Sequence, residues 1–501
     1  MKNKKSIIIF AVIISLLWCI TACTSDEQGS QVREPYADAL SYTMDLTLDT
    51  TEHTLTEIVT MEIQNMTDAP MAELCLRDMT PAFLDFCEEN YNEDNPNLKT
   101  AIAAITLTDS GEKLAYTYGD NQSILFIRLG DKAIAPGGTV SITVEMKTDI
   151  PNRGDRFGYR KTDKGTLYAM SFCFPYLADS ENGQWEQDPF FDDGESRSHD
   201  LADYTVTFRA PAEYLVAMTG SEVTKDGITT GTAESVRDFA IVACDFMQKD
   251  TFEVDGIRVN NYYLDGNFTE EYRAITEQTA KDSLAIYNEQ VGRYPYAELD
   301  IVPMLFGYAY GGMEYPGLVM ANASAFFDGP FFDAVSMEAK ISHEIAHQWF
   351  YAVVGNREYR EGWLDEGFAT LLERDTFGLT PCAAHDVVQK LDEFFITIEE
   401  KKETRDYYLE TAREDYRQVF LNVAPDAYPK DQSYGTAEYD GGYTFLQEVR
   451  VQMGDEAFQS FLRDYFEAFY MKTVTTGEFL EFLRSYDNSQ EMNSMINFYF
   501  K

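Results

Sequence analysis

The sequence predicts an all-β N-terminal domain followed by a mainly helical α+β domain, and two patterns carry this prediction. Up to about residue 255, apolar and polar residues alternate with period two, which is typical of strands that bury one face. From residue 256 onwards, most apolar residues recur with helical spacing. The chain has 501 residues, which is long enough for two or three domains with sizeable cores.

The extreme N-terminus has the pattern of an export signal. Lys2, Lys4 and Lys5 precede an apolar run, residues 7–19, that is too short to span a bilayer comfortably. The run leads into Ile-Thr-Ala-Cys at residues 20–23, which resembles the bacterial lipobox of an aliphatic residue and two small residues before a cysteine. A plain signal peptide with an incidental cysteine is the alternative.

The lipobox implies cleavage before Cys23 and a lipid on the thiol and amine of that residue. We therefore expect a lipoprotein signal peptide at residues 1–22 and a polar, flexible tether at residues 23–38. The mature protein would then be lipid-anchored to the bacterial membrane, at the cell surface and facing outside the cytoplasm.

Charge and cysteine content exclude several classes of protein. The chain carries 40 basic and 85 acidic residues, a formal charge of −45, and nucleic-acid binding would need a basic face. A solubilising surface explains this charge better than attraction for cationic peptides. Apart from Cys19 and Cys23, five cysteines without repeated spacing do not make a disulfide framework. We expect small buried thiols, although Cys75 and Cys87 could pair.

The first domain is predicted at residues 39–255. Strand alternation is clearest at residues 42–48, 57–64 and 139–146, and turn signals stand at residues 109–111 and 136–138. We expect a bent antiparallel sheet or sandwich, which serves either as a plain scaffold or as the wall of one side of a cleft.

The second domain is predicted at residues 256–501. Strands are expected at residues 257–263 and 299–303, on either side of a long amphipathic helix at residues 269–292. A short β segment carries Gly-Gly-Met-Glu-Tyr at residues 311–315, and the sequence is helical almost to its end from residue 334.

The most informative motif is His-Glu-Ile-Ala-His at residues 343–347. Two histidines four residues apart lie on one face of a helix, so His343 and His347 can bind one metal ion. Glu366, in Trp-Leu-Asp-Glu-Gly, can supply a third ligand and leave the fourth tetrahedral position open for water, as in catalytic zinc sites. Glu344 projects beside the metal, where a general base for that water belongs.

Two neighbouring carboxylates have open roles. Glu373 follows Glu366 by two turns on the same face of a helix expected from residue 364 to about residue 377. It is either a support that accepts an imidazole N–H or an ordinary exposed glutamate. Asp365 either supports the site or caps the helix.

These motifs together resemble the aminopeptidase N family of gluzincin zinc metallopeptidases. Glu366 lies nineteen positions after His347, and Gly-Gly-Met-Glu-Tyr-Pro-Gly stands about thirty residues before the histidines, at residues 311–317. Tyr294-Pro295 and Trp349-Phe350 add to the match. The resemblance covers most of the chain beyond the leader and indicates a short, two-domain bacterial lipoprotein form.

The resemblance implies a fold, a cofactor and a function. It implies an N-terminal antiparallel β-saddle or sandwich, followed by a thermolysin-like, mainly helical catalytic domain with one zinc ion per chain. It also implies that N-terminal residues of extracellular peptides are hydrolysed by zinc-activated water, with Glu344 as general base. A zinc endopeptidase or relaxed-specificity peptidase on the same site and a catalytically inactive surface binding protein are the alternatives.

The resemblance also implies how a substrate is held. Gly311, Gly312, Met313 and Glu314 match the family's G-x-M-E-N motif, in which the glycines let a substrate pair with an edge strand and the glutamate binds the free α-amino group. Tyr315 replaces the asparagine of the motif, which keeps the endopeptidase alternative open.

The family uses a tyrosine hydroxyl to stabilise the oxyanion, and Tyr439 takes that place in this sequence. Tyr434 and Tyr443 are competing candidates, because an oxyanion donor has only to reach the metal-bound oxygen. The family usually has lysine before the last glycine of this stretch, where this chain has Gly441.

Overall fold

The computed structural model describes residues 39–500 except for residues 121, 182–183, 193, 195–199, 308–309, 328, 330–332, 377–419 and 425–434. The described residues belong to one compact unit. The predicted leader, residues 1–22, and tether, residues 23–38, lie outside the described residues. Within the described ranges, no helix combines the length and hydropathy that a membrane span needs.

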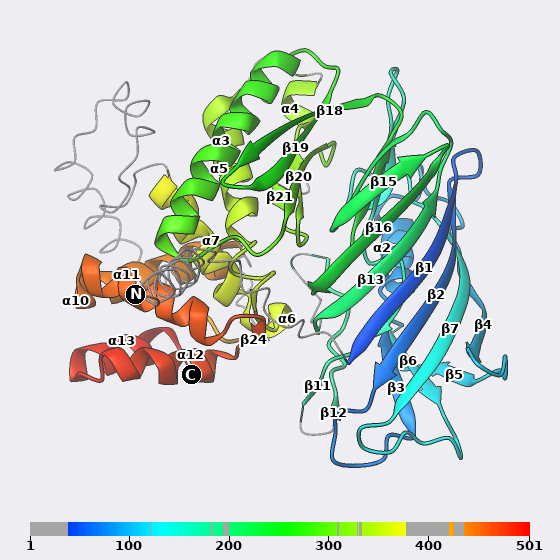
Figure 1. The fold of residues 1–501 in the computed structure, drawn as a ribbon, viewed down its shortest axis with the longest axis horizontal. Helices are drawn as coiled ribbons and strands as arrows, with labels where there is room; N and C mark the ends of the chain where they lie inside the picture. Colours follow the sequence, from blue (N-terminus) through cyan, green and yellow to red (C-terminus); the bar gives the residue numbers. More distant parts are fainter. Residues whose placement is uncertain are drawn as a thin grey trace, which may run out of the picture. The chain divides into compact units, whose positions relative to one another are not determined.

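The N-terminal part is a set of open sheets (Figure 1). The largest sheet has the spatial order β15 (Ser221–Lys225), β16 (Ile228–Val236), β13 (Ala202–Arg209), β1 (Leu40–Asp49), β2 (Thr54–Gln64), β7 (Thr139–Asp149) and β4 (Thr100–Leu107). All its neighbouring strands are antiparallel except β1 and β13. In β1, every second residue from Leu40 to Leu48 is buried, so the predicted period-two pattern is confirmed there.

Three smaller sheets complete this part. One has the order β10 (Tyr176–Leu177), β3 (Glu73–Arg77), β6 (Ile124–Arg128) and β5 (Ala115–Tyr118). Another has the order β14 (Leu215–Met218), β17 (Ile241–Cys244), β9 (Thr166–Met170) and β8 (Phe157–Lys161), and the third pairs β11 (Ser180–Glu181) with β12 (Gln184–Trp185).

The domain predicted as all-β contains a helix, α2 (Thr80–Asn90). It buries Phe83, Leu84 and Cys87 at helical spacing, with a proline in its first turn, where the missing N–H costs little. Cys87 and Cys75 are both buried free thiols, as are the other two cysteines in the described part of the chain. The expectation of buried thiols is confirmed for these four, and Cys382 lies outside the described residues.

A five-stranded mixed sheet begins the C-terminal part. Its order is β18 (Met247–Val254), β19 (Ile257–Leu264), β20 (Glu298–Met304), β22 (Leu318–Asn322) and β21 (Gly312–Met313), and the last of these is an edge strand. The strands β19, β20 and β22 are parallel, whereas β18 and β21 are antiparallel to their neighbours. The predicted boundary at residue 255 falls in the turn between β18 and β19.

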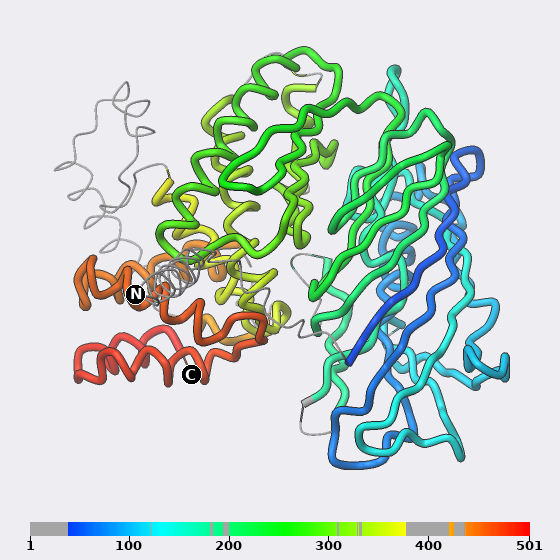
Figure 2. Tube along the Cα trace, in the orientation of Figure 1, coloured from blue at the N-terminus to red at the C-terminus, as the bar shows by residue number. Residues whose placement is uncertain are grey.

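Helices follow and surround this sheet. They are α3 (Thr269–Gln290), α4 (Ser324–Phe327), α5 (Ala334–Ala346), α6 (Glu358–Glu361), α7 (Trp363–Thr376), the π-helix η2 (Thr436–Gly441), α10 (Gly442–Met453), α11 (Asp455–Ala468), α12 (Thr476–Tyr486) and α13 (Gln490–Tyr499). Figure 1 shows α3 and α5 together beside the sheet, and Figure 2 shows the last helices, from orange to red, running alongside one another. Two short strands, β23 (Val354–Gly355) and β24 (Lys472–Thr473), pair between them. The predicted order, β domain first and mainly helical lobe second, is confirmed.

The five-stranded sheet has an apolar core on each face because its side chains alternate. On one face, residues such as Val259, Ile301 and Val319 pack with α3, α5 and α7. On the other face, residues such as Val302 and Met320 pack against β9, β14 and β17 of the N-terminal part. The sheet is therefore the layer through which the β domain and the helices meet.

The edge strand and its continuation follow the same alternation. Met313 and Tyr315 point into the core shared with the β domain and are almost fully buried. The Tyr315 hydroxyl contacts the Ser171 hydroxyl at 2.5 Å, and Ser171 Oγ donates to the Arg156 carbonyl at 2.9 Å. The residue that departs from the family motif therefore joins β21 to the β domain.

We predict that shortening Tyr315 destabilises the protein in two distinguishable steps. Tyr315→Ala should cost about 3–5 kcal/mol because it leaves a cavity between the two parts, whereas Tyr315→Phe should cost about 1 kcal/mol because it keeps the ring and removes the hydroxyl that contacts Ser171. Urea unfolding followed by tryptophan fluorescence measures both. Equal losses for the two variants would contradict the packing role of the ring.

Candidate metal centre and active site

The helix α5 presents the two histidines of the predicted site. Asp333 caps its start by accepting a hydrogen bond from the Ser336 amide at 3.1 Å. Ile341 and Ile345 are buried in the helical core, and this packing turns His343 and His347 towards the opposite side. His347 is the C-cap of α5 but keeps helical dihedral angles, so the two rings stay one turn apart.

The third predicted ligand comes from the start of α7, which packs beside α5. Glu366 lies in the first turn, and its Oε2 is 3.1 Å from His343 Nε2 and 3.4 Å from His347 Nε2. The two Nε2 atoms are 3.1 Å apart. Three ligands bound to a tetrahedral zinc at about 2.0–2.1 Å lie about 3.3–3.4 Å from one another. The three predicted ligands thus form a triangle of the size that zinc requires.

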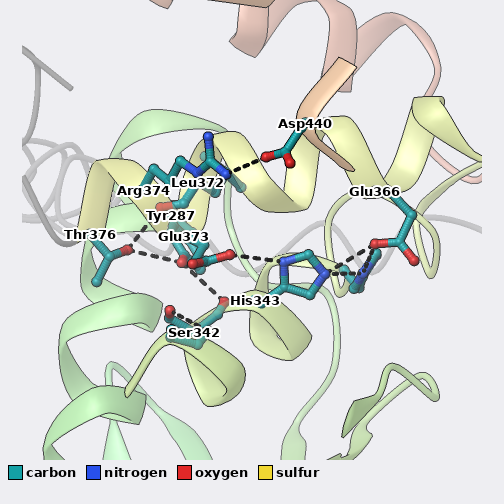
Figure 3. Close-up of polar contacts among 11 residues, drawn as sticks. Tyr287, Ser342, His343, Glu366, Leu372, Glu373, Arg374, Thr376 and Asp440 are labelled. Atoms are coloured by element: carbon teal, nitrogen blue, oxygen red, sulfur yellow. Dashed lines mark hydrogen bonds and ion pairs between the residues drawn. The ribbon is translucent and has the colours of Figure 1, made fainter. Parts of the chain in front are cut away.

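The outer nitrogen of each ring has an acceptor. His343 Nδ1 lies 3.2 Å from Glu373 Oε2, and His347 Nδ1 lies 3.1 Å from the Phe350 carbonyl oxygen. Figure 3 shows Glu373 and Glu366 on opposite sides of the His343 ring. Because an acceptor faces each Nδ1, the protons belong there, and both Nε2 lone pairs point at the centre of the triangle. Glu373 therefore lies where the sequence placed a supporting carboxylate.

Converging lone pairs in a buried site need a cation. Burial opposes ionisation of Glu366, but the charges and hydrogen bonds of His347 and His343 lower its pKa to about 2. Although burial disfavours the imidazolium, hydrogen bonds to Glu366 and Glu373 raise the pKa of His343 well above its usual value. A divalent ion would replace these protons, and two imidazoles with one carboxylate match catalytic zinc. The donor set fits one zinc ion.

Asp365 is not directed at this triangle. Its Oδ1 accepts hydrogen bonds from Asn356 Nδ2 and from the Glu366 amide, each at 3.0 Å. Burial raises the pKa of Asp365 well above its usual value. Asp365 therefore holds the first turn of α7 in place and, through its hydrogen bond to the Glu366 amide, helps to position Glu366.

Glu344 packs directly against the edge strand. A Cβ atom added to Gly312 would lie 2.6 Å from Glu344 Cγ, so only glycine lets the strand approach this closely. Alternation along the strand turns Glu314 to the same side as Gly312. Oxygens of Glu314 and Glu344 and a ring nitrogen of His347 all lie within 4.8 Å of one another. Met313 points the other way, so it can offer a substrate only its main chain.

One buried side chain that the sequence reasoning missed holds this strand to α5. Gln348 Nε2 donates to the carbonyls of Glu314 and Tyr315 at 3.3 and 3.1 Å, and its Oε1 accepts from the Gly317 amide at 2.7 Å. The available signal was a polar residue directly after His347 in an otherwise apolar run. Gln348 positions Glu314 relative to the two histidines.

Tyr439 lies on η2 and stacks on the His343 ring with centroids 5.5 Å apart and ring planes at 10°. The helices α7 and α10 approach closely here because both contact residues are glycines. A Cβ on Gly367 would lie 2.9 Å from Gly442 Cα, which is too close. Arg374 Nη2 also donates to Asp440 Oδ1 at 2.7 Å, as Figure 3 shows. The Tyr439 ring therefore lies beside the metal centre, on a helix that packs against α7.

The competing tyrosines fall elsewhere. Tyr443 is buried on α10 beneath the Arg374 guanidinium, 4.1 Å from its ring centroid, and it is not among the residues that line the cavity. Tyr434 lies outside the described residues, as does Cys23, the predicted lipidation site.

A cavity of about 490 Å³ joins these groups. Its wall includes the predicted residues on β21, α5, α7 and η2, namely Gly311, Gly312, Met313, Glu314, His343, Glu344, His347, Glu366, Glu373 and Tyr439. Gly194 adds a wall from the β domain, where Arg156 Nη2 donates to its carbonyl at 3.0 Å. Arg156 also lies 5.0 Å from the ring centroid of Tyr310, another lining residue. Sequence spacing gave no signal for Gly194 or Arg156.

The fold and the donor set define a zinc metallopeptidase domain, and comparisons with known proteins agree. Residues 276–499 match the peptidase family M1 domain. Leucine aminopeptidase 2 of Yarrowia lipolytica is 28% identical over 211 residues, and Aminopeptidase B of Rattus norvegicus is 26% identical over 220. These matches cover 41% and 43% of this chain but 31% of each relative, so the chain spans about a third of their length.

The fold is similar to solved structures over most of the chain. The crystal structure of an M1 zinc metallopeptidase from Deinococcus radiodurans has a TM-score of 0.62 at 17% identity and covers 93% of this chain and 94% of that one. A mutant of an M1 zinc metallopeptidase from that organism, bound to a Tyr-Ser-Ala substrate, has a TM-score of 0.61 at 16% identity and covers 92% and 95%. The match of residues 276–499 to the peptidase family M1 domain agrees with the predicted family.

We predict that Gly312→Ala lowers peptidase activity about 100-fold, because the methyl group must displace the Glu344 carboxylate, and a misplacement of about 1 Å has an effect of that size. Zinc content should not change, since no ligand is touched. Gly311→Ala is the matched control. Its methyl group meets no atom within 4 Å, so it should lose far less activity. Similar losses in the two variants would contradict the packing argument.

Proposed function

We propose that this protein is a zinc metalloaminopeptidase that releases the N-terminal residue of peptides. The observation that carries the proposal is the closeness of the Glu314 and Glu344 carboxylates, which lie with His347 within 4.8 Å of one another. Two buried carboxylates this close favour a cation between or beside them. A substrate ammonium held by Glu314 leaves room for only one residue before the bond that faces the metal centre.

Each residue of the site has a task in this reaction. Zinc, when bound by His343, His347 and Glu366, supplies a Lewis acid that polarises a carbonyl and lowers the pKa of water. Glu344 accepts the proton of the attacking water and delivers it to the leaving amine. Tyr439 donates a hydrogen bond to the oxygen that gains negative charge. Glu314 fixes the position of the N-terminus.

Two further observations support an aminopeptidase rather than an endopeptidase. Tyr315, whose departure from the family motif kept the endopeptidase alternative open, points away from the cavity and into the core shared with the β domain. Its side chain therefore does not alter the wall that a substrate would meet. The edge of β21 that faces away from β22 can pair with the main chain of an extended peptide.

We predict that peptides with a free N-terminus are hydrolysed and N-acetylated copies are not, with a difference in kcat/KM of at least about 100-fold, since the acetyl group removes the charge that Glu314 binds. A panel of aminoacyl 4-nitroanilides and matched blocked peptides measures this. Glu344→Gln should lose about 10²–10⁴-fold in kcat while keeping its zinc. The exposed Glu271→Gln on α3 is a matched control. Equal cleavage of free and blocked peptides would favour the endopeptidase alternative.

We also propose that the peptides are extracellular and that the protein is held at the outer surface of the bacterial membrane by a lipid on Cys23. The basic start, the apolar run and the lipobox at residues 20–23 support this placement.

Cys23→Ala should move the protein from the membrane fraction to the soluble or precursor fraction and abolish its labelling by a clickable fatty acid. Full labelling of the variant would contradict lipidation at Cys23.

A further inference from the structure

The face of α5 that carries the histidines continues past them towards the start of the helix. Ser336, Ala339 and Lys340 lie on this face and line the same cavity as His343. Residues three, four and seven positions apart share one side of a helix. Lys340 is thus one turn before His343 and is directed along the wall of the active site.

Lys340 is the one lysine or arginine among the described residues that line this cavity, whose acidic lining groups are four glutamates. It is half-buried, and within the described part of the chain its ammonium group has no hydrogen bond or ion pair. Burial lowers its pKa, and the carboxylate of Asp333, at the N-cap of α5, partly opposes this effect. A half-buried lysine without a partner costs free energy unless something pairs with it.

The cavity therefore has two ends of opposite charge. Glu314 lies beside His347, at the end of α5, and Lys340 lies seven residues earlier. Seven residues of helix span about 10 Å. Two or three residues of extended peptide span about 7–11 Å. A peptide whose ammonium is at Glu314 and whose first peptide bond faces the metal centre would carry its next residues towards Lys340.

We propose that Lys340 binds a carboxylate on the leaving-group side of the scissile bond. This carboxylate is either the C-terminal group of a di- or tripeptide or an acidic side chain directly after the cleaved bond. The inference rests on the proposed aminopeptidase function and adds a preference to it. The protein would therefore prefer short peptides that carry a negative charge directly after the first residue.

A set of four tripeptides tests the two sources separately. Each begins with the residue that is released fastest from the aminoacyl panel. One pair ends in Gly-Gly as the free acid or the amide, and the other pair ends in Asp-Gly-amide or Asn-Gly-amide. The wild type should prefer the charged member of at least one pair by about tenfold in kcat/KM, the effect of one charge-assisted hydrogen bond. The pair that shows the preference identifies the source of the carboxylate.

Variants assign the preference to this residue. Lys340→Met should bring the ratio within each pair close to one, Lys340→Arg should keep most of the preference, and Lys340→Glu should reverse it. Lys132→Met is the control, because it removes the same charge from a loop after β6 that does not line the cavity. It should leave the preference within each pair as in the wild type. An unchanged ratio in Lys340→Met overturns the proposal, as does equal cleavage of both members of each pair by the wild type.

A binding measurement separates this inference from the proposed function. Calorimetry on zinc-loaded Glu344→Gln protein compares the affinity for the acid and the amide of each pair, with and without Lys340→Met. If no peptide is cleaved by the wild type, the proposed function is wrong, and the calorimetric ratio still decides the role of Lys340. Equal affinities for the charged and neutral members would overturn it.

Discussion

The site depends on one constraint, which is that the lone pairs of His343, His347 and Glu366 must converge at one buried point. The Nδ1–H groups of His343 and His347 each donate to a fixed acceptor, Glu373 or the Phe350 carbonyl. Both Nε2 atoms are left facing Glu366. Without a cation, protons must separate these lone pairs, which is why hydrogen bonds to Glu366 and Glu373 raise the pKa of His343 although burial opposes its charge. The packing of α5 on α7, the hydrogen bonds of Asp365 and the glycine contact between Gly367 and Gly442 all serve to hold the three groups in this geometry.

The edge strand connects this centre to the rest of the molecule. Alternate residues of one short segment perform different tasks, since Gly312 and Glu314 face the cavity while Met313 and Tyr315 are anchored in the core against the β domain. Gln348 ties the same segment to α5 from the other side. The proposed selectivity for a free N-terminus would therefore depend on residues that never touch a substrate, because they set how far the Glu314 carboxylate stands from the metal centre.

Sequence reasoning succeeded where the chemistry is local. The four-residue spacing of His343 and His347 needs only one helix, and period-two alternation needs only one sheet face, so the ligands and the order of domains were predictable. It failed where distant segments meet. The helix α2 was hidden in a strand-rich region, the need for glycine at residue 312 is visible only once Glu344 packs on it, and Gly194 arrives from a loop of the β domain. Lys340 lay on a predictable helix face, but its lack of a partner among the described residues is visible only once the whole cavity is assembled.

The core between the two parts also has a consequence for the order in which the chain is made. β9, β14 and β17 leave the ribosome well before β20, β22 and β21, which are their partners in the shared core. Until about eighty further residues have emerged after β17, the apolar face formed by residues such as Ala169, Ala217 and Val242 has nothing to cover it. The apolar surface that later fixes the distance between Glu314 and the metal centre is thus exposed during synthesis, and such a surface favours aggregation until its partner strands emerge.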